Sequence, residues 1–217
     1  MLEPIQGEAG IIIPDHDYLQ KVKKLCQMFD VLLICDEVQT GLGRMGSLLA
    51  SYHYQVKPDI LLLGKALSGG MFPVSAVLAD NNVMKCMYPN THGSTFGGNP
   101  LASVVAMESI KTIIEENMIE NSKITGAIFK NELDLICKNS TISNKDKILD
   151  VRGIGLMNAI EFDSDKTANR FVELLIENRI LTKVTKENTV RLTPPLTLKD
   201  HDSYKSLEII ENVLKQL

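Results

Sequence analysis

The stretch Ile60-Leu61-Leu62-Leu63-Gly64-Lys65-Ala66-Leu67-Ser68-Gly69-Gly70 joins a short apolar run to a lysine and a glycine-rich turn. An apolar run of this length, bounded by glycine, is typical of a strand buried on both faces of a sheet. Comparable runs occupy residues 31–35, directly before Asp36, and residues 74–78. Residues 17–28 carry apolar side chains at helical spacing. Together these segments predict an α/β fold with a mostly parallel sheet.

The rest of the chain predicts a second, smaller domain. Asn99-Pro100 is typical of a capped helix start, and a further amphipathic helix is expected at residues 120–137. Beyond the polar stretch at residues 139–147, strands are expected at 148–151, 156–162, 180–184 and 189–192, and helices near 165–177 and 202–216. We therefore expect an α/β part at residues 1–120 and a small α+β domain at residues 121–217.

Bulk composition excludes several classes of partner. The chain has 217 residues, of which 44% are hydrophobic, and can bury a substantial core. A net charge of −4 gives no electrostatic reason to expect nucleic acid or an anionic membrane. The apolar runs are far shorter than the roughly 20 residues of a membrane span. The cysteines lie far apart without a C-x-x-C pair, which predicts buried or half-buried free thiols and no metal site; they are Cys26, Cys35, Cys86 and Cys137.

Three polar features are candidates for the positions at the carboxyl ends of strands where α/β sheets commonly present ligands. Asp36 ends the run at residues 31–35, and a carboxylate there needs a cation or a hydrogen-bond donor, although loop and helix-capping aspartates occur in the same position. Lys65 sits at the mouth of a predicted strand, where a desolvated, neutral amine would attack a carbonyl. Residues 93–100 are rich in hydroxyls and glycine and lead into a predicted helix, which suits a phosphate. Each feature alone is ordinary, but together they match the needs of a pyridoxal 5′-phosphate site.

Ordered motifs along the chain resemble those of the class III aminotransferases, a family of pyridoxal-phosphate enzymes. The motifs occupy residues 3–10, 36–41, 63–70, 93–100 and 190–195. Within the family they are most similar to ornithine aminotransferases, with acetylornithine and 4-aminobutyrate aminotransferases as the nearest alternatives. The resemblance implies a fold-type I pyridoxal-phosphate-dependent transferase. Residues 1–120 would be the C-terminal part of its large cofactor-binding domain with the interdomain helix, and residues 121–217 its small domain.

The resemblance also implies an activity and its setting. The reaction would transfer the δ-amino group of L-ornithine to 2-oxoglutarate, giving L-glutamate 5-semialdehyde and L-glutamate, a step of proline biosynthesis. The enzyme would be a homodimer with shared active sites in the cytoplasm, or in the mitochondrial matrix if a targeting segment precedes the chain. The chain would be the C-terminal half of that enzyme and inactive by itself. A non-catalytic fragment or structural subunit that binds the cofactor poorly or not at all is the alternative from another class.

The family's cofactor-binding roles fall on matching residues of this chain. Lys65 would bind the cofactor covalently and move a proton between the substrate carbon and the cofactor. Asp36 would keep the ring nitrogen protonated. Val38 would pack on the ring face, and Gln39 would hydrogen-bond the phenolic oxygen.

The remaining roles concern the phosphate and the substrate. Ser94 and Thr95 would bind the phosphate, with Thr95 reaching it from the partner subunit. Arg191 would hold the substrate α-carboxylate by a bidentate pair. Glu8 would pair with Arg191 while ornithine is bound and release it for 2-oxoglutarate, although by its residue type alone Glu8 is an ordinary surface-loop carboxylate. Arg44 is expected to be structural.

Overall fold

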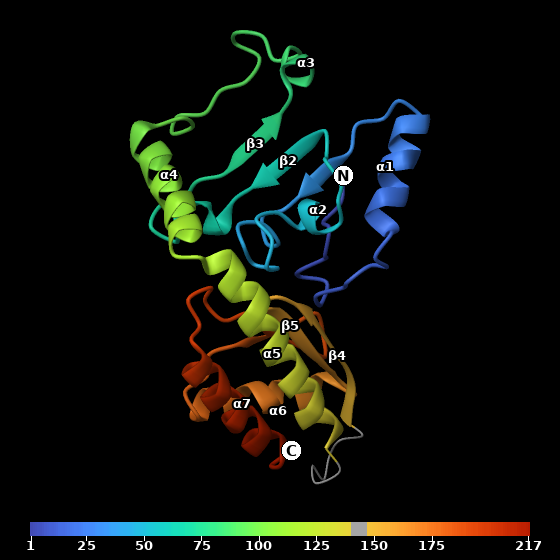
Figure 1. The fold of residues 1–217 in the computed structure, drawn as a ribbon, viewed down its shortest axis with the longest axis vertical. Coiled ribbons are helices and arrows are strands. Elements are labelled where there is room, and N and C mark those ends of the chain that lie inside the picture. Colours follow the sequence, from blue (N-terminus) through green and yellow to red (C-terminus); the bar gives the residue numbers. More distant parts are fainter. Residues whose placement is uncertain (140–146) are drawn as a thin grey trace. The chain divides into compact units, whose positions relative to one another are not determined.

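The computed structural model describes residues 1–139 and 147–217, which form two compact units (Figure 1). The first unit comprises Met1–Pro4, Pro14–Gly43 and Ser47–Asn117, and the second comprises Ile5–Ile13, Arg44–Gly46 and Met118–Leu217. The sequence-based division after residue 120 assigned residues 5–13 and 44–46 to the first domain, whereas both segments pack with the second unit. The polar stretch at 139–147 lies within the second unit where it is described, and residues 140–146 fall outside the described residues.

The first unit is built on a three-stranded sheet in the order β1-β2-β3. Its strands are β1 (Ile34–Asp36), β2 (Ile60–Leu63) and β3 (Ala76–Ala79). Because β1 pairs with β2 in parallel and β2 with β3 in antiparallel fashion, the described sheet is mixed and not mostly parallel as expected. The helices are α1 (Tyr18–Met28), α2 (Ala50–His53), the 3₁₀ helix η1 (Lys65–Ser68), α3 (Asn81–Met84) and α4 (Pro100–Glu115).

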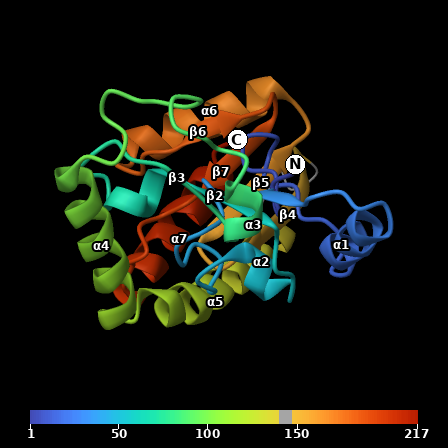
Figure 2. The same cartoon turned by 90° about the horizontal axis from the view of Figure 1, so that it is seen from above.

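Helices α1 and α4 lie at opposite edges of this sheet, α1 beyond β1 and α4 beyond β3 (Figure 1, Figure 2). Asn99 caps α4 by accepting a hydrogen bond from the Ala102 N–H, and Pro100 takes the first helical position, which confirms the predicted helix start.

Burial of the strands differs from the expectation of two covered faces. Val31 and Leu32 are exposed to 56% and 51%, and the strand begins only at Ile34. Val77 and Leu78 of β3 are exposed to 61% and 46%. Neighbouring residues of a strand point to opposite faces, so both faces of β3 remain open in the described chain.

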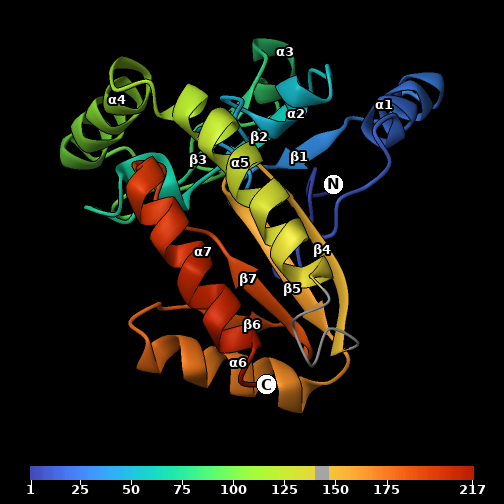
Figure 3. The same ribbon diagram turned by 60° about the horizontal axis from the view of Figure 1, so that its bottom comes forward.

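The second unit is an antiparallel sheet with helices packed against it (Figure 3). The strand order is β4-β5-β7-β6, with β4 (Ile148–Ile154), β5 (Met157–Phe162), β6 (Lys183–Thr185) and β7 (Thr189–Leu192). The helices are α5 (Met118–Lys138), α6 (Asp165–Glu177) and α7 (Asp200–Leu214). These elements confirm the predicted α+β arrangement. The core includes Phe162 and Phe171, whose ring centroids are 5.0 Å apart.

Helix α5 approaches the β4–β5 turn closely enough to require glycine at position 126. A Cβ at Gly126 would lie 2.3 Å from the carbonyl carbon of Gly155. Gly155 itself has a φ of +58°, a conformation that favours glycine. This contact sets how closely α5 packs against the β4–β5 turn.

The cysteines are free thiols. Cys35 and Cys137 are buried, and burial raises the pKa of each thiol to about 12. Cys86 is exposed, contrary to the expectation of buried or half-buried thiols. Within residues 1–139 and 147–217, no helix is both long and apolar enough to span a bilayer.

Candidate active site

Asp36 and Lys65 follow neighbouring parallel strands of the first unit. Asp36 is the last residue of β1 and is in register with Leu62 of β2, while Lys65 begins η1 two residues after β2 ends. Neighbouring parallel strands have their carboxyl ends on the same side of the sheet, so the predicted carboxylate and amine both lie at the carboxyl ends of β1 and β2. Asp36 is half-buried, and its Oδ1 accepts a hydrogen bond of 3.0 Å from the Val38 N–H.

The turns after these strands touch each other through Val38 and Gly64. A Cβ built on Gly64 would lie 3.4 Å from Cγ1 of Val38, so the valine side chain rests against the glycine. Gln39 follows on the same turn and is half-buried.

Lys65 occupies a strained backbone position. Its φ of +43° lies in the left-handed region, which is costly for a residue other than glycine and often marks a functional site. The Ser109 hydroxyl of α4 donates a hydrogen bond of 3.1 Å to the Ala66 carbonyl and holds the turn. Lys65 borders an open hollow of about 690 Å³ lined by Ser68 and residues 70–75. Its side chain is exposed, contrary to the desolvated amine that the sequence suggested.

Glu37, which the sequence analysis did not single out, fixes the chain directly after Asp36. Its side chain is 1% exposed and its Oε1 accepts hydrogen bonds from the Ser51 N–H and hydroxyl at 2.9 and 2.6 Å. Its Oε2 accepts a further bond from the Ala50 N–H at the start of α2. Burial raises the pKa of the Glu37 carboxyl, although these hydrogen bonds oppose the rise. Its sequence position beside another acid carried no sign of this burial.

Ser94 and Thr95 lie on an exposed loop before α4. The Ser94 hydroxyl accepts a hydrogen bond of 3.0 Å from the Gly97 N–H, which shapes the loop. Among the described residues, no hydrogen bond joins Ser94 or Thr95 to Asp36 or Lys65. The structure therefore brings Asp36, Val38 and the Lys65 turn to the same end of the sheet and shows no hydrogen bond that would join the hydroxyl loop to Asp36 or Lys65 within the described residues.

Glu8 lies in a tight loop of the second unit. Gln6 and Ile12 exchange backbone hydrogen bonds of 3.2 and 3.0 Å and close the loop. The Thr185 hydroxyl donates to the Glu8 carbonyl at 2.7 Å, and Arg152 Nε donates to the Gly10 carbonyl at 3.0 Å. These bonds set the position of the Glu8 backbone over β6.

Glu8 and Arg191 form an ion pair, the pairing that the family resemblance implied for the ornithine-bound state. Arg191 Nη1 lies 2.9 Å from Glu8 Oε1, and the side chains are 17% and 58% exposed, respectively. Lys183 Nζ lies 3.5 Å from the other carboxylate oxygen, Oε2. Lys183 was missed, although two predicted strands separated by a short turn indicate a hairpin that would pair it with Arg191, as the register shows.

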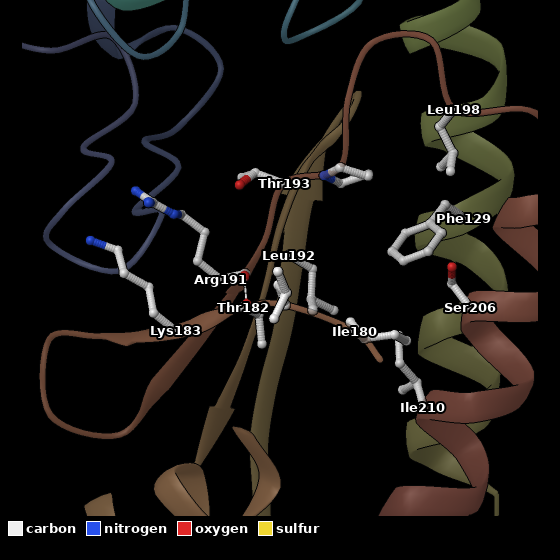
Figure 4. A pocket seen from close by; sticks show the side chains of 12 residues that line it. Phe129, Ile180, Thr182, Lys183, Arg191, Leu192, Thr193, Leu198, Ser206 and Ile210 are labelled. Atoms are coloured by element: carbon white, nitrogen blue, oxygen red, sulfur yellow. Dashed lines mark hydrogen bonds between the residues drawn. The ribbon is translucent and has the colours of Figure 1, made fainter. Parts of the chain in front are cut away.

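Figure 4 shows the Arg191 and Lys183 side chains extending to the same side, away from Phe129, Leu198 and Ile210. The latter three belong to the lining of a mainly apolar hollow of about 410 Å³ within the second unit.

Arg44 supports the segment that follows Arg191. Its Nη1 donates to the Leu156 and Pro194 carbonyls at 2.9 and 2.5 Å. Burial lowers the pKa of Arg44 to about 10, with a smaller contribution from the positive charge of Arg191. These contacts are structural.

The fold is that of a pyridoxal-phosphate-dependent transferase of fold type I, as expected. The chain matches the family model Aminotransferase class-III over residues 1–214 and belongs to that family, whose members depend on pyridoxal phosphate.

Relatives and solved structures agree with this membership. The ornithine aminotransferase of Emericella nidulans is 47% identical over 221 residues, which cover 100% of this chain and 47% of the relative. The structure of the Plasmodium yoelii ornithine aminotransferase has a TM-score of 0.92 and 45% identity, covering 99% of this chain and 56% of that one. The acetylornithine aminotransferase of Elizabethkingia anophelis has a TM-score of 0.93 and 44% identity over the same shares, 99% and 56%. The chain spans about half the length of the curated relatives it matches.

Proposed function

We propose that the full-length protein transfers the δ-amino group of L-ornithine to 2-oxoglutarate, giving L-glutamate 5-semialdehyde and L-glutamate. The observation that carries this proposal is the 2.9 Å pair between Glu8 and Arg191. Ornithine reacts through its distal amine, whereas 2-oxoglutarate receives the amino group at its α-position. A cation that binds carboxylates, together with an acid that masks it, suits these different binding modes.

The residues at the strand ends fit pyridoxal phosphate. A half-buried carboxylate and an amine follow the carboxyl ends of neighbouring parallel strands, and Val38 contacts Gly64 in the turns that follow these strands. Asp36 would balance the protonated ring nitrogen, Val38 would contact the ring and Gln39 would hydrogen-bond its phenolic oxygen. Lys65 would hold the cofactor and carry a proton on Nζ. When bound, the cofactor supplies an electron sink that stabilises negative charge on the substrate carbon.

The phosphate and the dimer belong to the same proposal. Ser94 and Thr95 would bind the phosphate, and Thr95 would do so across a homodimer, which suits a hydroxyl loop exposed in the single chain.

The substrate residues would act in turn. While ornithine is bound, Glu8 would occupy Arg191 and keep it from the substrate carboxylate. When 2-oxoglutarate binds, Glu8 would leave and Arg191 would hold the carboxylate beside the keto group through paired N–H donors.

Acetylornithine aminotransferase is the second candidate, because the structure of the Elizabethkingia anophelis enzyme matches this chain as well as the ornithine aminotransferases do. Single-turnover rates of the full-length, cofactor-loaded protein with L-ornithine and N-acetyl-L-ornithine separate the two. We expect ornithine to react faster by at least about tenfold. A preference of the same size for N-acetylornithine would assign the second activity instead.

Lys65→Ala should abolish turnover together with the visible absorbance of the lysine-bound cofactor, because the variant has no amine to hold it. Borohydride reduction of the unmodified protein, followed by peptide mapping, should place the cofactor on Lys65. An adduct on any other lysine would remove Lys65 from this role.

A further inference from the structure

We propose that Lys183 is a positioning residue that holds the Glu8 carboxylate after Glu8 leaves Arg191. The inference rests on the proposed function, because it concerns how Arg191 becomes available to a dicarboxylate substrate. Lys183 would act through Glu8 and would not bind the substrate itself.

The two cations already contact different oxygens of the same carboxylate. Arg191 lies 2.9 Å from Oε1, and Lys183 lies 3.5 Å from Oε2. The first distance is that of a charge-assisted hydrogen bond, whereas the second is longer than one. A small rotation of the Glu8 side chain toward Lys183 can therefore shorten the second contact as the first one breaks.

The strands keep both cations in place during such a rotation. Lys183 and Arg191 are paired residues of β6 and β7, and the Thr182 hydroxyl donates a hydrogen bond to the Arg191 carbonyl. The Thr185 hydroxyl holds the Glu8 carbonyl at 2.7 Å, so the backbone of Glu8 is fixed and only its side chain must turn.

The two cations differ in solvent exposure, which determines where the Glu8 carboxylate would move. The Arg191 side chain is 17% exposed, whereas that of Lys183 is 59% exposed. Transfer of Glu8 from Arg191 to Lys183 would move the carboxylate toward solvent and leave the more enclosed cation for the substrate. Because Lys183 replaces the lost partner, the departing carboxylate would remain paired with a positive charge.

A ligand affects such an equilibrium only through different affinities for its two states. Since Lys183 contacts Glu8 weakly in the paired state and more closely in the released state, its removal should disfavour release. The full-length, cofactor-loaded protein should be titrated with glutarate, a dicarboxylate that cannot accept an amino group. Lys183→Met should weaken glutarate binding by about two- to fivefold, the range of an exposed ion pair. The same variant should slow the 2-oxoglutarate half-reaction at subsaturating substrate and leave the ornithine half-reaction unchanged.

The Glu8→Ala background provides the decisive comparison. If Lys183 acts through Glu8, Lys183→Met should have little further effect there, as a double-mutant cycle would show. Lys183→Arg should retain glutarate binding, and Lys186→Met, which removes a like charge from the same hairpin, should not weaken it. An undiminished effect of Lys183→Met in the Glu8→Ala background would overturn the proposal, because Lys183 would then attract the dicarboxylate directly. Absence of any effect in the unmodified background would overturn it as well. Glutarate binding does not depend on which amino donor is used, so a failure of ornithine to react would reject the proposed function without altering this test.

Discussion

Two adjacent acids at the end of β1 have opposite environments. Asp36 is half-buried and uses one oxygen to accept a hydrogen bond from the Val38 N–H. Glu37 is buried, and its carboxylate oxygens accept hydrogen bonds from the Ala50 and Ser51 N–H groups and from the Ser51 hydroxyl. Asp36 therefore remains available for a ligand, while Glu37 stabilises the turn that presents it.

Asp36→Asn should preserve cofactor binding and reduce the single-turnover rate by at least about tenfold. The amide retains an oxygen to accept the Val38 N–H, so the turn should remain intact. It has no charge to balance a protonated ring nitrogen, and one pKa unit of lost stabilisation corresponds to about 1.4 kcal/mol. Cofactor content from absorbance, measured beside the rate, separates the two effects. Asp80→Asn, at an exposed carboxylate after β3, should have no effect, and a normal rate for Asp36→Asn would exclude the proposed role.

Glu8→Ala should weaken the preference for the δ-amine of ornithine. Without Glu8, Arg191 can bind α-carboxylates in both half-reactions, so glutamate should be processed faster relative to ornithine. Stopped-flow measurement of each half-reaction tests this, with Glu187→Ala on the β6–β7 hairpin as the matched control. Equal slowing of both half-reactions with unchanged regioselectivity would make Glu8 a structural carboxylate.

Arg191→Ala should mainly damage the 2-oxoglutarate half-reaction. Loss of a charge-assisted contact to a desolvated partner commonly costs about 2–5 kcal/mol. The ornithine half-reaction should change less, because Arg191 is then occupied by Glu8. A variant that slowed only the ornithine half-reaction would contradict this order.

At the scale of elements, hydrophobic periodicity predicted where helices and strands lie in the chain better than it predicted their direction and burial. The run at residues 60–63 and the helical spacing of residues 17–28 correspond closely to β2 and α1. The same patterns did not reveal that β3 is antiparallel or that Val77 and Leu78 are exposed. A run of apolar residues indicates that a segment can form a strand. The direction and burial of that strand depend on the connecting segments and on the neighbouring elements, which a local pattern does not contain.

The candidate site shows the same division. Asp36 and Lys65 could be placed together from the sequence, because each follows an apolar run and neighbouring parallel strands end on the same side of a sheet. Glu37 could not be placed in this way, since its partners at residues 50 and 51 lie across a loop whose path the local sequence does not specify.

Gly126→Ala should destabilise the second unit by roughly 1–3 kcal/mol or more, the cost of overpacking a tight contact. The added methyl would lie 2.3–2.6 Å from backbone atoms of Gly155, which cannot yield as a side chain would. Urea denaturation followed by circular dichroism measures the loss. Asn131→Ala, at an exposed position of the same helix, should change the free energy of unfolding by less than about 0.5 kcal/mol. Equal midpoints for both variants would show that α5 can shift on the sheet.

At the scale of the whole molecule, the order of segments along the chain does not match their division between the two units. The second unit takes Ile5–Ile13 and Arg44–Gly46 from within the stretch that otherwise builds the first unit. Glu8 reaches Arg191 only because the chain leaves the first unit after Pro4 and returns to it at Pro14. The local sequence pattern does not reveal these short segments, because many of their contacts are with residues more than a hundred positions away in the chain.

This interleaving predicts that residues 118–217 produced alone should be less stable than the same unit within the chain. Ile5 and Ile11 are fully buried, and Arg152 donates hydrogen bonds to the Gly10 and Ile11 carbonyls. Removing these residues exposes the apolar surface that Ile5 and Ile11 cover and leaves part of the Arg152 guanidinium unpaired. The free energy of unfolding should fall by roughly 2–5 kcal/mol. Hydrogen exchange of the β5 and β7 amides reports the stability of this sheet in both proteins. Arg152→Met in the intact chain should reproduce part of the loss, because it removes the hydrogen bonds but retains the isoleucines. Equal protection in the isolated unit and the intact chain would show that the Ile5–Ile13 segment is held by the unit without contributing to its stability.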